Sequence, residues 1–225
     1  MPRYKKKTLE LQVKTLGALD VLVDGKSLFR PKQNHGKINS LLQYLIIHQG
    51  KPCRPETIAE SLWPDNDYVD ERKIIHTYIH RLNQILRGDN ALELDVTPYL
   101  SLSNTGGSYI LRLSGSVTLD VQALRETVAG SAALRERGDI VAALGAIFGL
   151  YGAHFLNDSI HYSLVLHMRN ELLRICGDAV SVLCGRLFGL ECYDDVLTAA
   201  ERYFALDECD EGVNYWYLKA LQELG

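Results

Sequence analysis

The sequence has no run approaching the roughly 18 consecutive apolar residues that cross a membrane, although 47% of its 225 residues are hydrophobic. Its start, MPRYKKKTLELQVK, carries charge but lacks the apolar stretch of a secretion signal. The five cysteines are odd in number and widely spaced, and no CxxC pair occurs. Disulfide frameworks and zinc or redox motifs are therefore not indicated. We expect a cytoplasmic protein with reduced thiols and no membrane partner.

Motifs of common enzyme classes are missing too. The sequence has no nucleophile elbow, P-loop or dinucleotide-binding glycine fingerprint, and no carboxylate pair with a defined partner. His76 and His80 have the i, i+4 spacing of a helical metal pair, but HTYIH lacks the glutamate of HExxH and no third ligand is evident nearby. We therefore expect a protein that is not an enzyme and that uses no metal or cofactor.

Charge is distributed unevenly along the chain. Residues 1 to 115 hold 16 of the 24 Lys and Arg and 12 of the 28 Asp and Glu, a net charge of +4, whereas residues 116 to 225 have a net charge of −8. Such asymmetry suggests two domains with different partners, although a chance distribution is the alternative.

Periodicity in the first half changes from strand to helix and back to strand. Alternation over residues 9 to 23 predicts a short antiparallel sheet, and Asp24-Gly25 is a turn dipeptide. Helical spacing follows in three segments, 38–46, 55–63 and 70–88. Alternation returns over residues 92 to 113 about Gly106-Gly107, which predicts a hairpin. This order is typical of a winged helix.

The third helical segment has two different faces. Its apolar residues predict a buried face formed by Ile75, Tyr78, Ile79, Leu82 and Leu86. A recognition helix needs long hydrogen-bonding side chains at i, i+3, i+4 and i+7, because this spacing places several of them in one major groove. The residues that satisfy it are Lys73, His76, Thr77 and His80, with Arg81 at the flank. An ordinary solvated helix face is the alternative interpretation.

Three further cations are candidate DNA contacts. Lys32 and Lys37 lie near the start of the first helical segment, where a cation and free backbone N–H groups can hold a phosphate; generic surface lysines are the alternative. Arg112 is the only cation between Leu92 and Leu113, so it is the basic residue available to a wing.

From Val117 onward, strand signals disappear. Within the second half, ECYDDVLTAAERYFALDE fits a tetratricopeptide-repeat helix, and ERGDIVAALGAIFGLY suggests a second pair with Gly138-Asp139 as its turn. The predicted fold is α+β: an N-terminal winged helix-turn-helix domain over residues 1–115, followed by an all-α tetratricopeptide-like helical repeat domain over residues 116–225. The predicted helices are 124–137, 140–151, 162–190 with a division near Gly177, 194–205 and 213–224.

The order of these segments resembles the Streptomyces antibiotic regulatory protein family, which joins a response-regulator-type winged helix to a bacterial transcriptional activator domain. The resemblance covers roughly residues 9 to 225. It is carried by LGALDVLVDGKSL, PKQNHGKINSLLQYLIIHQGKP, ETIAESLWPDND, RKIIHTYIHRLNQIL, GGSYILRL, LYGAHFLND and YDDVLTAAERYFALDE. The resemblance implies a transcription factor, in the first instance an activator, that binds double-stranded promoter DNA with its first domain.

Further partners follow from the same resemblance. The second domain is expected to mediate self-association, as in a homodimer, or partner contacts. In the family, a loop before the recognition helix can contact RNA polymerase, but the acidic residues here also fit an N-terminal helix cap. These acidic residues are Asp65, Asp67, Asp70 and Glu71.

A second hypothesis belongs to a different class of protein. Asn83-Gln84 stand where family recognition helices usually have arginines, and the hairpin is poor in cations. These departures favour a protein-interaction or effector-sensing scaffold with weakened DNA binding.

Overall fold

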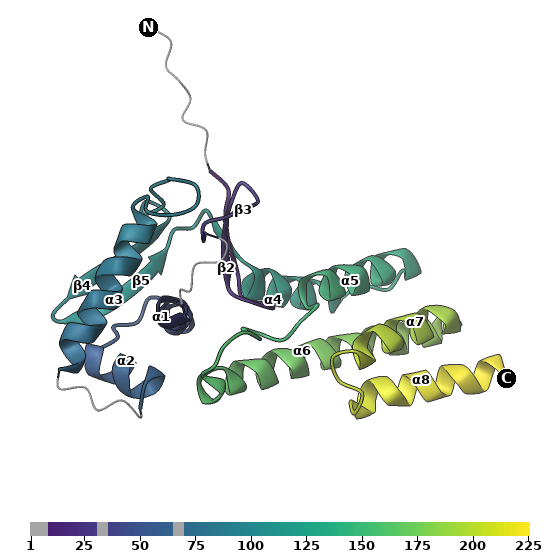
Figure 1. Ribbon diagram of the computed structural model, residues 1–225. Coiled ribbons are helices and arrows are strands. Elements are labelled where there is room, and N and C mark those ends of the chain that lie inside the picture. Colours follow the sequence, from purple (N-terminus) through teal and green to yellow (C-terminus); the bar gives the residue numbers. More distant parts are fainter. Residues whose placement is uncertain (1–8, 31–35, 65–69) are drawn as a thin grey trace, which may run out of the picture. The chain divides into compact units, whose positions relative to one another are not determined.

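The computed structural model describes residues 9–30, 36–64 and 70–225 (Figure 1). The chain forms two compact units. Unit 1 comprises Met1–Lys14, Leu19–Leu119 and Asp158–Leu164, and unit 2 comprises Thr15–Ala18, Asp120–Asn157 and Val165–Gly225. Among the described residues, no helix is long and apolar enough to cross a lipid bilayer.

Unit 1 contains a four-stranded sheet with the strand order β3-β2-β1-β6. Its strands are β1 (Leu11–Lys14), β2 (Asp20–Val23), β3 (Lys26–Ser27) and β6 (Val117–Leu119). The expected antiparallel pair is confirmed, since Leu11 lies opposite Val23 and Val13 opposite Val21, and all four side chains are buried. The expectation of no strand from Val117 onward was wrong, because β6 pairs in parallel with β1. A strand of three residues is too short to show a period of two.

The three helices of unit 1 confirm the helical segments. They are α1 (Gly36–Ile47), α2 (Pro55–Leu62) and α3 (Glu71–Leu86). Pro55 occupies the first position of α2, where its missing N–H costs nothing. Asp70 caps α3 by accepting the Lys73 backbone N–H at 3.1 Å, as the helix-cap interpretation of this residue expected. Helices α2 and α3 each bury one apolar stripe, whereas α1 is buried on all sides from Ser40 to Ile46.

A hairpin completes the winged helix, so the N-terminal fold class is confirmed. It is formed by β4 (Leu100–Thr105) and β5 (Ser108–Leu113). Gly106 and Gly107 both have positive φ, 59° and 80°, which a two-residue hairpin turn requires at its centre and glycine adopts without strain. The predicted strand began too early: residues 92–99 form turns and irregular structure, in part because Asn90 hydrogen-bonds to the backbone of Leu92 and Leu94.

Unit 2 is built from helices. These are α4 (Asp120–Ser131), α5 (Arg137–Leu150), α6 (Tyr162–Gly189, apart from its first turn), α7 (Tyr193–Phe204) and α8 (Glu211–Leu224). Helix α4 packs on α5 and α7 packs on α8, as expected of repeat-like pairs. Gly138-Asp139 lies within α5 rather than in a turn, so that prediction was wrong. Helix α6 also runs without a division at Gly177, where a Cβ would lie 2.6 Å from the Tyr203 hydroxyl; this glycine permits a close approach.

Candidate nucleic-acid interface

Helix α3 presents its polar face to solvent. Its exposed side chains are Arg72, Lys73, His76, Thr77, His80, Arg81 and Gln84. On the opposite face Ile75, Ile79, Leu82 and Leu86 are buried, as expected, whereas Tyr78 is half-buried. The predicted separation of the two faces is therefore confirmed, and the five predicted residues of α3 lie together on one exposed surface.

Some of these side chains already have partners. Lys73 Nζ lies 3.1 Å from Asp70 Oδ2, and the Thr77 hydroxyl donates to the Lys73 carbonyl at 2.8 Å. His76 Nδ1 lies 3.0 Å from the Tyr109 hydroxyl of β5. The α3 surface is thus organised at its start by its own helix cap and along one flank by the hairpin.

The opposite flank of α3 is lined by cations around an aromatic ring. The Arg81 guanidinium lies 5.9 Å from the centre of the Tyr78 ring, and Lys37 Nζ of α1 lies 5.9 Å from the same ring and 5.3 Å from the ring of Trp63. Lys37 and Arg81 therefore come together although 44 positions separate them in the sequence. Lys32 lies outside the described residues.

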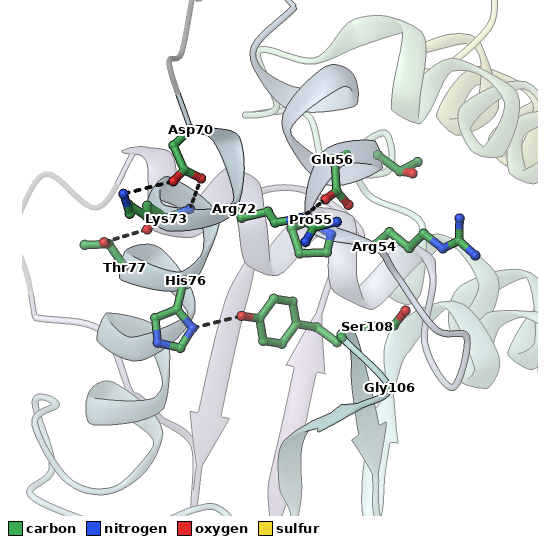
Figure 2. A pocket seen from close by; sticks show the side chains of 13 residues that line it. Arg54, Pro55, Glu56, Asp70, Arg72, Lys73, His76, Thr77, Gly106 and Ser108 are labelled. Atoms are coloured by element: carbon green, nitrogen blue, oxygen red, sulfur yellow. Dashed lines mark hydrogen bonds and ion pairs between the residues drawn. The ribbon is translucent and has the colours of Figure 1, made fainter.

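A groove of about 1050 Å³ opens between the start of α2, the start of α3 and the hairpin turn (Figure 2). Its cationic side chains are Arg54, Arg72 and Lys73. Figure 2 shows Arg72 paired with Glu56 across the groove. The groove combines backbone turns, hydrogen-bonding side chains and cations, a combination that suits a phosphate backbone.

Cationic neighbours lower the pKa of the two acidic groups of the groove. Hydrogen bonding to Arg72 lowers the pKa of Glu56, and hydrogen bonding to Lys73 lowers the pKa of Asp70. Reciprocally, Glu56 raises the pKa of Arg72. At neutral pH the groove therefore contains two ion pairs, in which Arg72 and Lys73 are already partly neutralised.

Arg112 lies away from the hairpin turn. It is exposed, faces Ser101 across the ladder, and donates to the Ser103 hydroxyl at 3.0 Å. The turn itself, residues 105–108, contains no cation. Its small residues allow a close approach of backbone to a ligand, whereas Arg112 is placed toward the base of the hairpin.

Sequence reasoning missed three residues of this surface. Arg54 and Arg72 line the groove, and Tyr109 contacts His76. Arg54 had a signal, since it immediately precedes the proline that begins α2. Tyr109 had none, because its partner lies 33 positions earlier in the sequence and alternation cannot show which helix a strand residue faces.

The described residues contain no group of three or more His, Cys, Asp or Glu side chains that could hold a metal ion. In particular, His76 is engaged with Tyr109 on the flank of α3.

Comparison with known proteins finds a family match for part of unit 1. Residues 35–96 match the family described as "Transcriptional regulatory protein, C terminal". These residues include all three helices of unit 1, so this part of the chain is similar to the DNA-binding winged helix of transcriptional regulators. None of the curated proteins matches the chain.

A solved structure shares the fold of nearly the whole chain. It is described as "Mycobacterium tuberculosis EmbR in complex with low affinity phosphopeptide", and it matches 95% of this chain with a TM-score of 0.74 and 20% sequence identity. The chain spans 55% of the length of that protein. The similarity shows a common fold, a winged helix followed by a helical region.

Proposed function

We propose that the protein is a cytoplasmic transcriptional regulator, in the first instance an activator, that binds double-stranded promoter DNA through the exposed face of α3. The observation that carries this proposal is the α3 surface. Five hydrogen-bonding or cationic side chains spaced for one major groove are exposed on a helix whose other face is fixed in the core. In this proposal Lys73, His76, Thr77 and His80 approach base edges.

Cations at the edges of that surface would position the duplex. Arg81 and Lys37 meet around Tyr78 on one flank, and Arg54 and Arg72 line the groove on the other. Phosphate contacts fix register and orientation, while base contacts carry sequence information. We assign Lys32 and Arg112 to the same positioning role.

Unit 2 would supply contacts with proteins. Its last helix, α8, exposes the apolar side chains of Tyr215, Leu218, Leu221 and Leu224. Exposed apolar side chains gathered on one helix are a feature of protein-binding surfaces, and the −8 charge of residues 116–225 disfavours contact with phosphate. We propose that unit 2 mediates homodimer formation or contact with another protein such as RNA polymerase, in a manner similar to a bacterial transcriptional activator domain.

A second candidate function is a scaffold with weakened DNA binding. It is favoured by the pairing of Arg72 with Glu56 and of Lys73 with Asp70, which reduces the positive field of the groove. The absence of a cation from the hairpin turn, residues 105–108, favours it as well.

Binding of the full chain to genomic DNA fragments at several salt concentrations separates the two functions. A regulator that engages phosphates releases counterions, so its affinity must fall steeply as salt rises. We expect such binding, with a subset of fragments retained at physiological salt. A folded chain that shows no salt-dependent binding would instead support the scaffold.

A further inference from the structure

A single side-chain hydrogen bond connects the hairpin to α3 within the described part of the chain. It joins the Tyr109 hydroxyl to His76 Nδ1 at 3.0 Å (Figure 2). Tyr109 is only 5% exposed, whereas His76 faces solvent on the α3 surface. A buried side chain therefore holds one nitrogen of an exposed imidazole and leaves the other, Nε2, without a described partner.

The backbone fixes the position of Tyr109. Its N–H donates to the Cys53 carbonyl at 2.8 Å, and its carbonyl accepts the Cys53 N–H at 2.8 Å. Cys53 lies two residues before Pro55, the first residue of α2, so this bridge connects the hairpin to the helix-turn-helix. The phenol is consequently held against α3 by backbone pairing, independently of its contact with His76.

The buried hydroxyl of Tyr109 keeps its proton. Burial raises the pKa of Tyr109, so the phenol is not ionised at neutral pH. In the described part of the chain its hydrogen-bond partner is His76 Nδ1. A buried hydroxyl proton needs an acceptor, and His76 Nδ1 is the acceptor that lies in place for it.

An imidazole that accepts at Nδ1 carries its own proton on Nε2 when neutral. We propose that Tyr109 is a positioning residue that fixes His76 as a hydrogen-bond donor through Nε2, directed at an acceptor atom on DNA. This inference rests on the proposed function. His80 is exposed on the same face and makes no hydrogen bond among the described residues, so its tautomer is not fixed in this way.

A fixed donor selects among base edges. In the major groove guanine presents the acceptors O6 and N7, adenine N7 and thymine O4, whereas cytosine presents the donor N4. His76 held in the Nε2–H form therefore disfavours cytosine at the base it contacts. A phosphate oxygen offers the same acceptor chemistry without sequence preference.

The tautomer is measured in the free, full-length protein. With ring nitrogens of histidine labelled with ¹⁵N, we expect NMR to show His76 as the Nε2–H form in wild type and as a mixture in Tyr109→Phe, which removes only the hydroxyl. His80 is the internal control and should not change. An Nδ1–H form in wild type, or the same spectrum for His76 in the variant, would overturn the proposal.

A second variant separates loss of the hydroxyl from a disturbance of the hairpin. Asn104 is exposed and lies directly opposite Tyr109 in the β4–β5 ladder, so Asn104→Ala changes a neighbour of the phenol and leaves its hydroxyl in place. His76 should keep the wild-type tautomer in this variant. If Asn104→Ala shifts the tautomer as far as Tyr109→Phe does, the effect comes from the hairpin and not from the hydroxyl, and the proposal is wrong.

Selection from a pool of randomised duplexes tests the DNA contact. Loss of one hydrogen bond should reduce the affinity of Tyr109→Phe by roughly 2- to 10-fold. A loss confined to one base position identifies a base acceptor, and a uniform loss identifies a phosphate. Wild-type affinity and preference in the variant would overturn this proposal alone, whereas failure of wild type to bind any duplex would overturn the proposed function and this inference with it.

Discussion

Arg72 and Lys73 are adjacent cations at the start of α3, and each is paired with a carboxylate. Glu56 of α2 holds Arg72, and the cap residue Asp70 holds Lys73. The cap also binds a backbone N–H of α3, so Asp70 has a structural role. Glu56 does not cap another helix. Its negative charge therefore acts mainly on Arg72 and on any phosphate that approaches the groove.

Substitution of Glu56 by Gln should strengthen DNA binding. The change removes a negative charge that phosphate must approach and frees Arg72 to engage a phosphate. One additional phosphate contact steepens the plot of log affinity against log salt by about 0.9. Fluorescence anisotropy of a labelled duplex over a series of salt concentrations measures both effects.

Glu60→Gln is the matched control. Glu60 is exposed on the same helix but does not line the groove, so its removal changes the net charge equally. An identical gain for both variants would mean that net charge alone, and not release of Arg72, accounts for the effect.

His161 gives the fold a pH dependence. Its Nε2 is buried without a hydrogen-bond partner among the described residues, and burial lowers its pKa. In the unfolded chain a histidine takes up a proton as pH falls below about 6.5, while the folded protein resists protonation down to its lower pKa. As far as His161 is concerned, the folded protein is therefore most stable above about pH 6.5. Its free energy of unfolding decreases as the pH falls from about 6.5 to the lower pKa that His161 has in the folded state.

Replacement of His161 by Gln should make the unfolding temperature less sensitive to acid between about pH 7 and pH 5. His167, which is exposed, serves as the control, and His167→Gln should keep the wild-type pH dependence. Parallel pH profiles for wild type and His161→Gln would show that this imidazole does not control acid stability.

Two glycines inside helix α6, Gly177 and Gly185, are sites of close contact with other side chains. A Cβ at Gly185 would lie 2.7 Å from the ring of Trp216 in α8. By contrast, a Cβ at Gly145 of α5 would meet nothing within 4 Å. Gly185 is therefore required by packing, and Gly145 is not.

The two glycine-to-alanine substitutions should change stability in opposite directions. Both gain the roughly 0.5–1 kcal/mol by which alanine favours a helix over glycine. Only Gly185→Ala incurs overpacking, at a cost of about 1–3 kcal/mol, so it should be the less stable of the two by about that amount. Urea unfolding followed by circular dichroism gives the difference. Equal stability of the two variants would show that the α6–α8 contact accommodates a methyl group.

Long periodic elements were predictable from sequence, and contacts between elements were not. The stripe of Ile75, Ile79 and Leu82 predicted both the existence of α3 and its exposed face, because helical period alone fixes which residues share a side. The pairing of His76 with Tyr109 depends on how the hairpin folds onto α3, which no local pattern encodes. Gly177 was misjudged for the same reason, since its close neighbour Tyr203 comes from another helix.

At the scale of the whole molecule, the chain passes between the two units more than once, because each unit is formed from three separate segments. The short segment Thr15–Ala18 belongs to unit 2, where the Asp120 carboxylate accepts hydrogen bonds from Thr15 and from the backbone N–H of Leu16. Asp158–Leu164 belongs to unit 1, where Gln43 donates to Asp158 at 3.2 Å. Such interleaving was invisible to composition, which suggested only a basic and an acidic half, and the division at residues 115 and 116 stays a prediction.

The central claim is that the exposed face of α3 engages DNA. Its most direct test is the salt dependence of duplex binding by full-length wild type, Arg81→Ala and Lys26→Ala. Arg81 lies at the edge of that face, whereas Lys26 is exposed on β3 and serves as the matched control. We expect Arg81→Ala to lose about 1–3 kcal/mol of binding free energy. Its salt slope should be shallower by about 0.9 if it contacts a phosphate, and Lys26→Ala should retain wild-type behaviour. Equal affinity and equal slope for wild type and Arg81→Ala, or wild-type binding that does not depend on salt, would contradict the account.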